Sequence, residues 1–199
     1  MNSREKILAE LKRHARQGQP LPALPIPAAT DTDNVERLKS VLTGIGGQWL
    51  MANDWNDIVD QLKRRFPSPS RWVNVVNELS PMLDNTFDKD PHLLENVTLA
   101  ILKGHFAVAE NGAVWMTNER MGDRALPYIC EHLAIVINVN DICATMYDAY
   151  ERIGSTVYGL GAFIAGPSKT ADIEQSLVLG AHGPKSMTLI LLNSSSSQG

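Results

Sequence analysis

The sequence predicts an α/β protein with a three-layer α/β/α arrangement, in which a mostly parallel sheet lies between layers of helices. Two observations support this fold class. Short apolar segments of strand length alternate along the chain with segments whose apolar residues recur at helical spacing. The apolar and β-branched segment 133–139 has the composition of a strand that a parallel sheet buries on both faces. A chain of 199 residues with 44% apolar residues can bury a sizeable core in one domain.

The chain divides into three regions by composition. Residues 1–30 contain a helix predicted at 3–17 and a linker rich in proline, 31–193 form the α/β domain, and 194–199 are a polar tail that we expect to be disordered. Prolines at positions 20, 22, 25 and 27 remove backbone donors, so the linker forms no regular structure. We expect the tethered helix to dock on the domain or on another subunit. If that subunit is a second copy of this chain, the protein is a homo-oligomer.

Within the domain, the spacing of apolar residues places each element. A helix is expected at 170–179, and Asp141 is expected to cap a helix that carries Ile142, Met146 and Tyr150. Asn111-Gly112 suits a type I′ turn between two strands. The other predicted helices are 33–44 and 55–66, and the predicted strands are 48–51, 72–76, 97–102, 106–109, 114–116, 133–139, 161–165 and 187–192.

Charge and cysteine content exclude several classes of protein. A formal charge of −4 is unsuited to binding a nucleic-acid backbone, which requires a clustered basic face. The two cysteines, Cys130 and Cys143, form no short-spaced pair, so we expect no iron–sulfur cluster or metal in this chain. The sequence shows no apolar signal-peptide core and no apolar run of the roughly 20 residues that span a bilayer, so we expect a cytoplasmic protein without membrane insertion.

The segment Gly166-Pro-Ser-Lys-Thr170 is the first candidate site. It follows a predicted strand and precedes the helix expected at 170–179. The N–H groups at the start of a helix bind anions, and Ser168, Lys169 and Thr170 would add two hydroxyls and an ammonium there. Asp172 lies one turn from Lys169 and can pair with it. The same residues also make an ordinary helix start, so both interpretations remain open.

The second candidate is His182, between the glycines of Gly180-Ala-His-Gly-Pro184. A histidine in a glycine-rich turn is exposed and titrates near neutral pH. A helix spanning 170–179 would be about 15 Å long and would place Ser168 and His182 at opposite edges of the sheet. Either the helix is short and the chain doubles back, or the two motifs are separate features.

Together these motifs resemble a known family. The string Gly166-Pro-Ser-Lys-Thr-Ala-Asp-Ile-Glu174, followed by Gly180-Ala-His-Gly-Pro184, is similar to the C-terminal signature of the LUD domain of the lactate-utilisation protein C type. The upstream segments Ala107–Trp115, Arg124–Pro127 and His132–Val136 are also similar to that family. The resemblance extends over residues 35–193.

The resemblance implies a domain similar to the ribose-5-phosphate isomerase and CoA-transferase-like superfamily. It also implies a role in oxidising L-lactate to pyruvate alongside iron–sulfur partner proteins. Two departures from the family pattern stand out. The family's Glu-Thr-Gly-Thr is Glu110-Asn-Gly-Ala113 here, and its usual arginine is Lys169, which lacks the bidentate fork of a guanidinium.

The leading hypothesis is therefore a component of a lactate-oxidising system that binds a small anionic ligand. Its catalytic residues would be Glu110 and His182, with His182 accepting the hydroxyl proton of the substrate. Any redox cofactor is unknown. The expected ligand-binding residues are Ser168, Lys169, Thr170, Asp172 and, through the resemblance, Arg124.

Two alternatives remain. Glu110-Asn-Gly112 resembles the tripeptide around the nucleophilic glutamate of some CoA-transferases, which would make the chain a stand-alone enzyme on a CoA-linked or sugar-phosphate substrate. The chain could instead be a scaffold without catalysis, with the N-terminal helix as its docking element.

Overall fold

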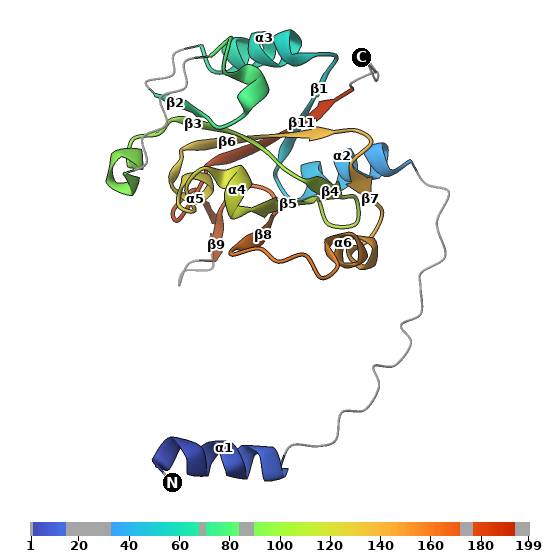
Figure 1. Ribbon diagram of the computed structural model, residues 1–199. Coiled ribbons are helices and arrows are strands. Elements are labelled where there is room, and N and C mark those ends of the chain that lie inside the picture. The colour runs from blue at the N-terminus through green and yellow to red at the C-terminus, as the bar shows by residue number, and fades with distance from the viewer. Residues whose placement is uncertain (1, 15–32, 68–70, 84–89, 172–176, 194–199) are drawn as a thin grey trace.

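The computed structural model describes residues 2–14, 33–67, 71–83, 90–171 and 177–193 (Figure 1). Its centre is a five-stranded sheet in the order β1-β11-β6-β3-β2, in which every pair of neighbours is parallel. The strands of this main sheet are β1 (Gln48–Ala52), β2 (Trp72–Asn74), β3 (Leu99–Lys103), β6 (His132–Asn138) and β11 (Ser186–Leu192). The predicted α/β class with a mostly parallel sheet is thus confirmed.

The burial of strands β6 and β11 on both faces explains their apolar composition. Residues 133–137 of β6 and 187–192 of β11 are all buried, and successive side chains point to opposite faces of the sheet. Leu133, Ile135 and Ile137 belong to the core on one face, whereas Ala134 and Val136 belong to the core on the other. The main sheet therefore has two cores and requires a covering layer on each side.

Helix α3 (Trp55–Arg65) covers one face. Asp54 caps it by accepting a hydrogen bond from the Asp57 N–H at 2.8 Å, and Ile58, Val59 and Leu62 turn inward onto the sheet. Figure 1 shows α3 on one side of the main sheet, with most of the remaining structure on the other. Two short 3-10 helices, η1 (Asn77–Leu79) and η2 (Pro91–Leu94), lie between β2 and β3, where the sequence predicted no regular element.

The opposite face is covered partly by helix α2 (Asn34–Gly44) and partly by a second, four-stranded sheet that the sequence did not predict. This sheet has the order β7-β4-β5-β8 and mixes parallel and antiparallel pairs. Its strands are β4 (Phe106–Val108), β5 (Ala113–Thr117), β7 (Ile142–Cys143) and β8 (Gly161–Ile164), and the short helices α4 (Asn118–Met121) and α5 (Leu126–Ile129) follow β5.

Helix α6 (Met146–Ile153) packs on the outer face of the second sheet, where Ala149 and Ile153 join a small core with Phe106 and Trp115. The helix begins later than predicted. Thr145, rather than Asp141, is its N-cap, because Thr145 and Asp148 form a capping box. The expected helical residue Ile142 lies in β7 instead.

The turn between β4 and β5 also differs from the prediction. The hairpin exists, but Gly112 donates its N–H to the carbonyl of Val108, and Val108 pairs with Ala113 in the ladder. The connection therefore has four residues, 109–112, rather than the two of a type I′ turn. Glu110 lies at its tip, as expected.

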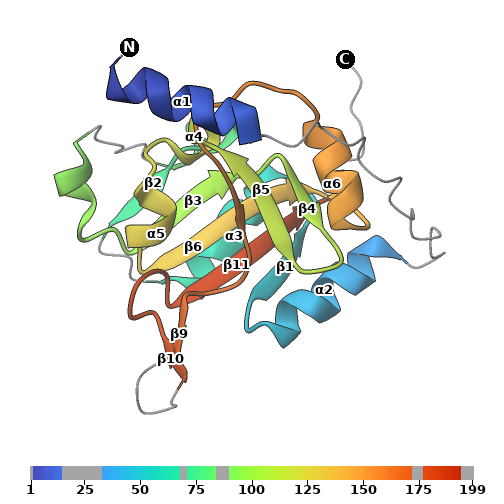
Figure 2. The same ribbon diagram turned by 90° about the horizontal axis from the view of Figure 1, so that it is seen from below.

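The helix predicted at 170–179 is wrong. The chain instead forms β9 (Lys169–Ala171) and β10 (Leu177–Leu179), which pair antiparallel, with Thr170 opposite position 178. The anion site that was expected at a helix N-terminus after Ser168 therefore has no helix behind it. Figure 2 shows this small hairpin projecting from the edge of the domain.

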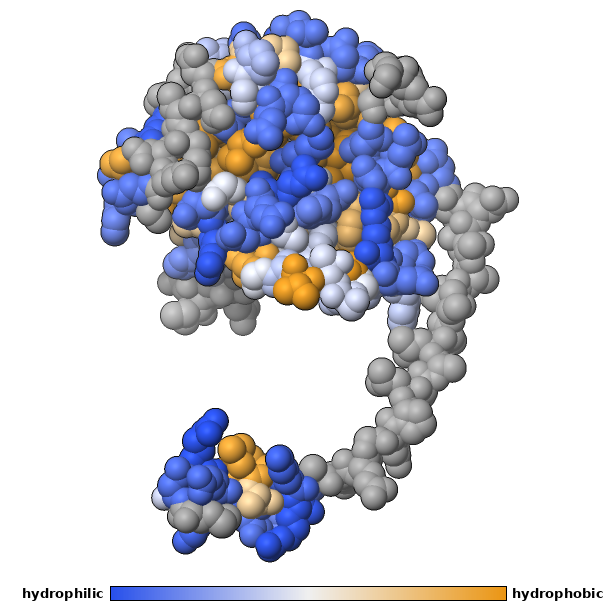
Figure 3. Space-filling model, in the orientation of Figure 1, coloured by the Kyte–Doolittle hydropathy of each residue, from blue (hydrophilic) through white to orange (hydrophobic). Residues whose placement is uncertain are grey.

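The N-terminal helix is confirmed over α1 (Ser3–His14), while residues 15–17 and the proline-rich linker lie outside the described residues. None of its side chains is buried. Ile7, Leu8 and Leu11 are exposed, and Figure 3 shows apolar atoms on this helix facing solvent. The predicted docking of this helix stays a prediction.

The two sheets approach each other closely at Gly104, which lies between β3 and β4. A Cβ added there would lie 2.4 Å from Cγ1 of Val114 and 2.6 Å from Cδ1 of Ile137. We expect Gly104→Ala to lower the free energy of unfolding by about 1–3 kcal/mol through overpacking, measured by urea denaturation. In the control Gly44→Ala the added Cβ meets no atom within 4 Å, so stability should stay the same or rise. Equal stability of the two variants would contradict the close approach of the sheets.

Candidate functional site

The two halves of the sequence motif lie side by side. Ser168 donates its N–H to the carbonyl of Pro184 at 2.9 Å, and its own carbonyl accepts from the Gly180 N–H at 3.0 Å. Two backbone hydrogen bonds thus fix Ser168 against segment 180–184. The chain doubles back through the β9–β10 hairpin, which answers the question that the spacing left open.

Glycine at position 183 allows this contact. A Cβ there would lie only 3.0 Å from the Cβ of Ser168, which is tighter than ordinary van der Waals contact. Gly166 and Gly180 adopt φ angles of +68° and +76°, which residues with a Cβ rarely adopt. The glycines of the motif are therefore explained by local geometry.

Ser168 and His182 line one cavity of 240 Å³, which we call the motif cavity. Its walls are mostly apolar, and its polar side chains come from Tyr128, Ser168 and His182. The complete lining is Pro127, Tyr128, Leu133, Phe163, Ile164, Ala165, Gly166, Pro167, Ser168, His182, Gly183 and Pro184. A small apolar chamber with a few converging polar groups is typical of a binding site for a small molecule.

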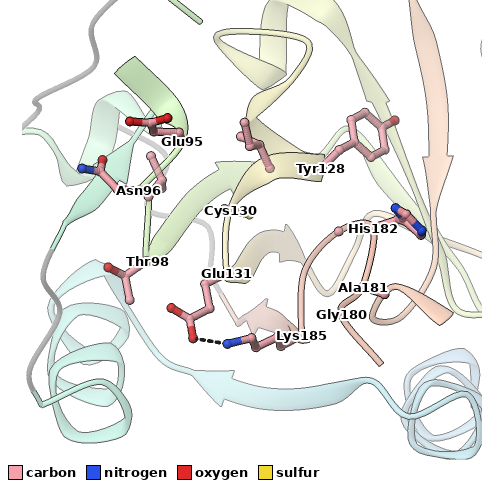
Figure 4. Close-up of a pocket in the computed structure, with 13 residues that line it drawn as sticks. Glu95, Asn96, Thr98, Tyr128, Cys130, Glu131, Gly180, Ala181, His182 and Lys185 are labelled. Carbon is pink, nitrogen blue, oxygen red and sulfur yellow. Dashed lines mark hydrogen bonds and ion pairs between the residues drawn. The ribbon is translucent and has the colours of Figure 1, made fainter. Parts of the chain in front are cut away.

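A larger cavity of 590 Å³, which we call the edge cavity, adjoins the motif cavity. It is formed by segments 95–98, 128–131 and 180–185, and Tyr128, His182 and Gly183 line both cavities. Figure 4 shows Tyr128 and His182 on one side of the edge cavity and a pair formed by Glu131 and Lys185 on another. His182 is exposed and lines both cavities.

The edge cavity lies at the amino edge of the main sheet, because its three segments precede β3, β6 and β11. Lys185 Nζ lies 2.7 Å from Glu131 Oε1, and this hydrogen bond lowers the pKa of the Glu131 carboxyl. Burial raises the pKa of Tyr128 and raises that of the Cys130 thiol to about 12. Cys130 is therefore a neutral thiol at neutral pH and not a nucleophile.

Among the described residues, Lys169, Thr170 and Arg124 do not line either cavity. Lys169 lies near the end of α2: its Nζ would be 3.7 Å from a Cβ at Gly46. Thr170 lies on β9, and Arg124 is exposed, with its Nε donating to the side chain of Asn118 at 3.2 Å. Asp172 is outside the described residues. The structure thus brings Ser168 and His182 to one cavity, which the side chains of Lys169 and Arg124 do not line.

Glu110, the second predicted catalytic residue, accepts a hydrogen bond from the Met146 N–H at 2.8 Å. Met146 is the first residue of α6, so the Glu110 carboxylate satisfies one of the free N–H groups at the start of that helix. This contact gives Glu110 a structural role that does not depend on catalysis.

Sequence reasoning missed Tyr128 and the Glu131–Lys185 pair. A signal for the pair was present, because both residues immediately precede predicted parallel strands. The amino ends of parallel strands meet at the same edge of a sheet, so segments 128–131 and 180–185 could have been expected to meet.

Within the described ranges, no group of three or more His, Cys, Asp or Glu side chains is placed to hold a metal ion. None of the described helices has the length and apolar character needed to cross a bilayer.

Comparison with known proteins places these features in a family context. The profile of a family described as the LUD domain matches residues 87–192. The lactate utilization protein C of Geobacillus sp. (strain WCH70) is 30% identical over 170 residues, which cover 79% of this chain and 67% of that protein. The protein of the same name from Bacillus pumilus (strain SAFR-032) is 26% identical over 112 residues, which cover 53% of this chain and 47% of that protein. In most of the similar proteins named lactate utilization protein C, the aligned region spans about half of the protein's length.

A solved structure has a similar fold. The crystal structure of a DUF162 family protein from Deinococcus radiodurans superposes with a TM-score of 0.64 and 15% sequence identity, and the match covers 85% of this chain and all of that one. At this identity the similarity speaks to the fold alone.

The partly buried histidines predict how stability depends on pH. Burial lowers the pKa of His105 and His132 below their usual value of 6.5, so the folded state favours the neutral imidazoles. Their stabilising effect is complete above pH 6.5 and is lost as pH falls, because the unfolded chain takes up protons first. We expect the free energy of unfolding to decrease between about pH 7 and pH 5.5, measured by urea denaturation.

The double variant His105→Gln and His132→Gln tests this assignment, since it should show a smaller decrease over the same range. His14→Gln is the control, because His14 lies on the exposed helix α1. An unchanged pH dependence in the double variant would contradict the assignment.

Proposed function

The chain belongs to the LUD-domain family, and from this premise we propose that it is a component of a system that oxidises L-lactate to pyruvate with iron–sulfur partner proteins. The single observation that carries the proposal is the match to curated relatives named lactate utilization protein C, which in one case extends over 79% of this chain. Because most alignments span about half of the relative, the activity of the complete relatives is an inference for this chain.

The motif cavity is the proposed site for the small anionic ligand. Its volume of 240 Å³ lies below the range of about 300–1,000 Å³ typical of sites for drug-sized ligands, which suits a ligand with few atoms. The Ser168 hydroxyl can donate to a carboxylate, and His182 can accept the proton of a substrate hydroxyl. Lys169 and Arg124 keep their predicted anion-binding role only if the ligand site extends beyond this cavity.

The chemistry requires a partner. Oxidation of L-lactate to pyruvate removes two electrons and two protons, and the imidazole of His182 can take one of these protons. The two cysteines form no short-spaced pair that could hold an iron–sulfur cluster. In this proposal the C2 hydrogen of lactate and both electrons therefore pass to the iron–sulfur partners or to a cofactor that acts with them. The proposal assigns the protein to the cytoplasm with these partners.

Growth on L-lactate tests the proposal in a strain that lacks the gene. The wild-type chain should restore growth, whereas Ser168→Ala and His182→Ala should not. Loss of a general base typically lowers a rate by about 10²-fold or more, so lactate oxidation in extracts of the His182→Ala strain should fall at least that far. His92→Ala is the matched control, because His92 is exposed on η2 and lines neither cavity. Full rescue by both site variants would contradict the proposed site.

The CoA-transferase-like or sugar-phosphate alternative depends on Glu110. Glu110→Gln separates its two roles, because the amide oxygen can still accept the Met146 N–H hydrogen bond but cannot attack a thioester. An enzyme that used a glutamyl nucleophile would lose its activity in this variant while keeping its thermal stability. Trapping with acyl-CoA and borohydride should modify Glu110 of the wild-type chain, and the absence of modified Glu110 would count against this alternative.

The exposed apolar residues of α1 favour the scaffold alternative, because they offer a docking surface that no described part of the domain covers. A pull-down with the iron–sulfur partners, with and without residues 1–30, tests it. A scaffold should lose its partners when these residues are removed, while Ser168→Ala and His182→Ala should leave partner binding unchanged.

A further inference from the structure

A third cavity has a lining that shares no residue with the motif cavity, although its Trp115 packs against Phe163 of the motif cavity with ring centres 4.8 Å apart. Its volume is 380 Å³, and it lies beside the outer face of the second sheet, between strands β4 and β5 and helix α6. His105 follows β3 and Asp141 follows β6, so this cavity is next to the carboxyl edge of the main sheet. Ligands of open α/β sheets favour that edge. We call it the α6 cavity.

Arg152 on α6 is held in place at this cavity. One of its guanidinium nitrogens lies 2.5 Å from Oδ1 of Asp141, and the guanidinium carbon lies 4.9 Å from the centre of the Phe106 ring. An ion pair and a cation–π contact thus fix the fork of this side chain. Asp141 balances its charge, so Arg152 contributes oriented donors rather than net charge.

Arg120 on α4 contributes the net positive charge. It is partly buried, and in the described part of the chain no carboxylate lies within 4.0 Å of it. Glu78, whose pKa Arg120 helps to lower, already forms an ion pair with Lys103. A guanidinium that lines a cavity without an anionic partner is suited to binding an anion.

The other polar groups of the cavity do not cancel this charge. His105 Nε2 lies 2.8 Å from Oγ1 of Thr117, and burial together with the guanidinium of Arg120 lowers the His105 pKa. The imidazole is therefore neutral at pH 7 and adds hydrogen-bonding capacity. With Arg152 balanced by Asp141, the residues that line the cavity carry one net positive charge, that of Arg120. The Glu119 carboxylate, whose charge also acts on His105, is not among the lining residues.

Aromatic side chains form the apolar wall. Trp115 is buried in the second sheet, and the ring of Tyr158 packs edge-on against it at 5.2 Å. Tyr158 belongs to the exposed segment that follows α6. Aromatic rings beside an anion-binding group suit a ligand that has a carbon skeleton as well as a charge.

We propose that the α6 cavity binds a small organic oxyanion, a carboxylate or a phosphate ester, with Arg120 and Arg152 holding the anionic group and Trp115 and Tyr158 contacting the carbon skeleton. This site is separate from the motif cavity, and it would give the chain a second ligand, either a further substrate or a regulator. The α6 cavity shares no lining residue with the motif cavity, so this proposal can be tested independently of the proposed function.

Isothermal titration calorimetry of the full chain tests the proposal with three probes: inorganic phosphate, phenyl phosphate and benzoate. Comparing phenyl phosphate with inorganic phosphate measures how much the phenyl ring of the ligand contributes to affinity. Benzoate distinguishes a carboxylate site from a phosphate site. Phenyl phosphate or benzoate should bind, and Arg120→Gln should weaken that binding about tenfold or more, as loss of a charge-assisted hydrogen bond implies. Arg64→Gln, on the exposed side of α3, removes the same charge elsewhere and should leave affinity unchanged.

Tyr158→Ala provides a second variant in an exposed segment, where the substitution should not disturb folding. It should weaken phenyl phosphate more than inorganic phosphate. The proposal is overturned if no probe binds more tightly than about 10 mM, or if Arg120→Gln and Tyr158→Ala both bind as the wild-type chain does.

Discussion

The parallel pairing of β6 with β3 on one side and β11 on the other is the constraint on which the rest of the structure depends. It brings the residues that precede these three strands to one edge of the sheet, although they are far apart in the chain. The edge cavity consists of those residues, and the motif cavity opens beside it. The same pairing places His105 and Asp141 near the opposite edge, where the α6 cavity lies. Both candidate sites are therefore consequences of the strand order.

Strands with a strong apolar signal were predictable, and the reason is physical. A strand that is buried on both faces, such as β6 or β11, must be almost continuously apolar, and few other structures have that composition. Helices α2 and α3 combine a clear apolar stripe with a capping aspartate, so their positions were also predictable. The second sheet was predictable only in part. Its β4–β5 hairpin and β8 were expected, whereas β7 is short and the pairings β4–β7 and β5–β8 join segments far apart in the sequence.

The incorrect prediction of a helix at 170–179 shows that the local sequence alone did not determine the structure of this segment. Segment 168–179 has hydroxyls and an acidic residue where a helix start has them, and its spacing of apolar residues is compatible with a helix. In the structure, Ser168 bonds instead to Gly180 and Pro184, and Lys169 pairs opposite position 179. Long-range hydrogen bonds thus override the local preference. The error matters for function, because the hairpin unites Ser168 and His182, whereas the helix would have separated them.

The central claim is that Ser168 and His182 form one site for a small carboxylate. NMR spectra of the full chain during titration with L-lactate test it most directly, with the ring signals of the five histidines followed one by one and the His182 signal assigned with His182→Ala. The account predicts a saturable shift of the His182 signal that is absent in Ser168→Ala, while the His92 signal stays in place. A His182 signal that does not move, or that moves equally in Ser168→Ala, would contradict it.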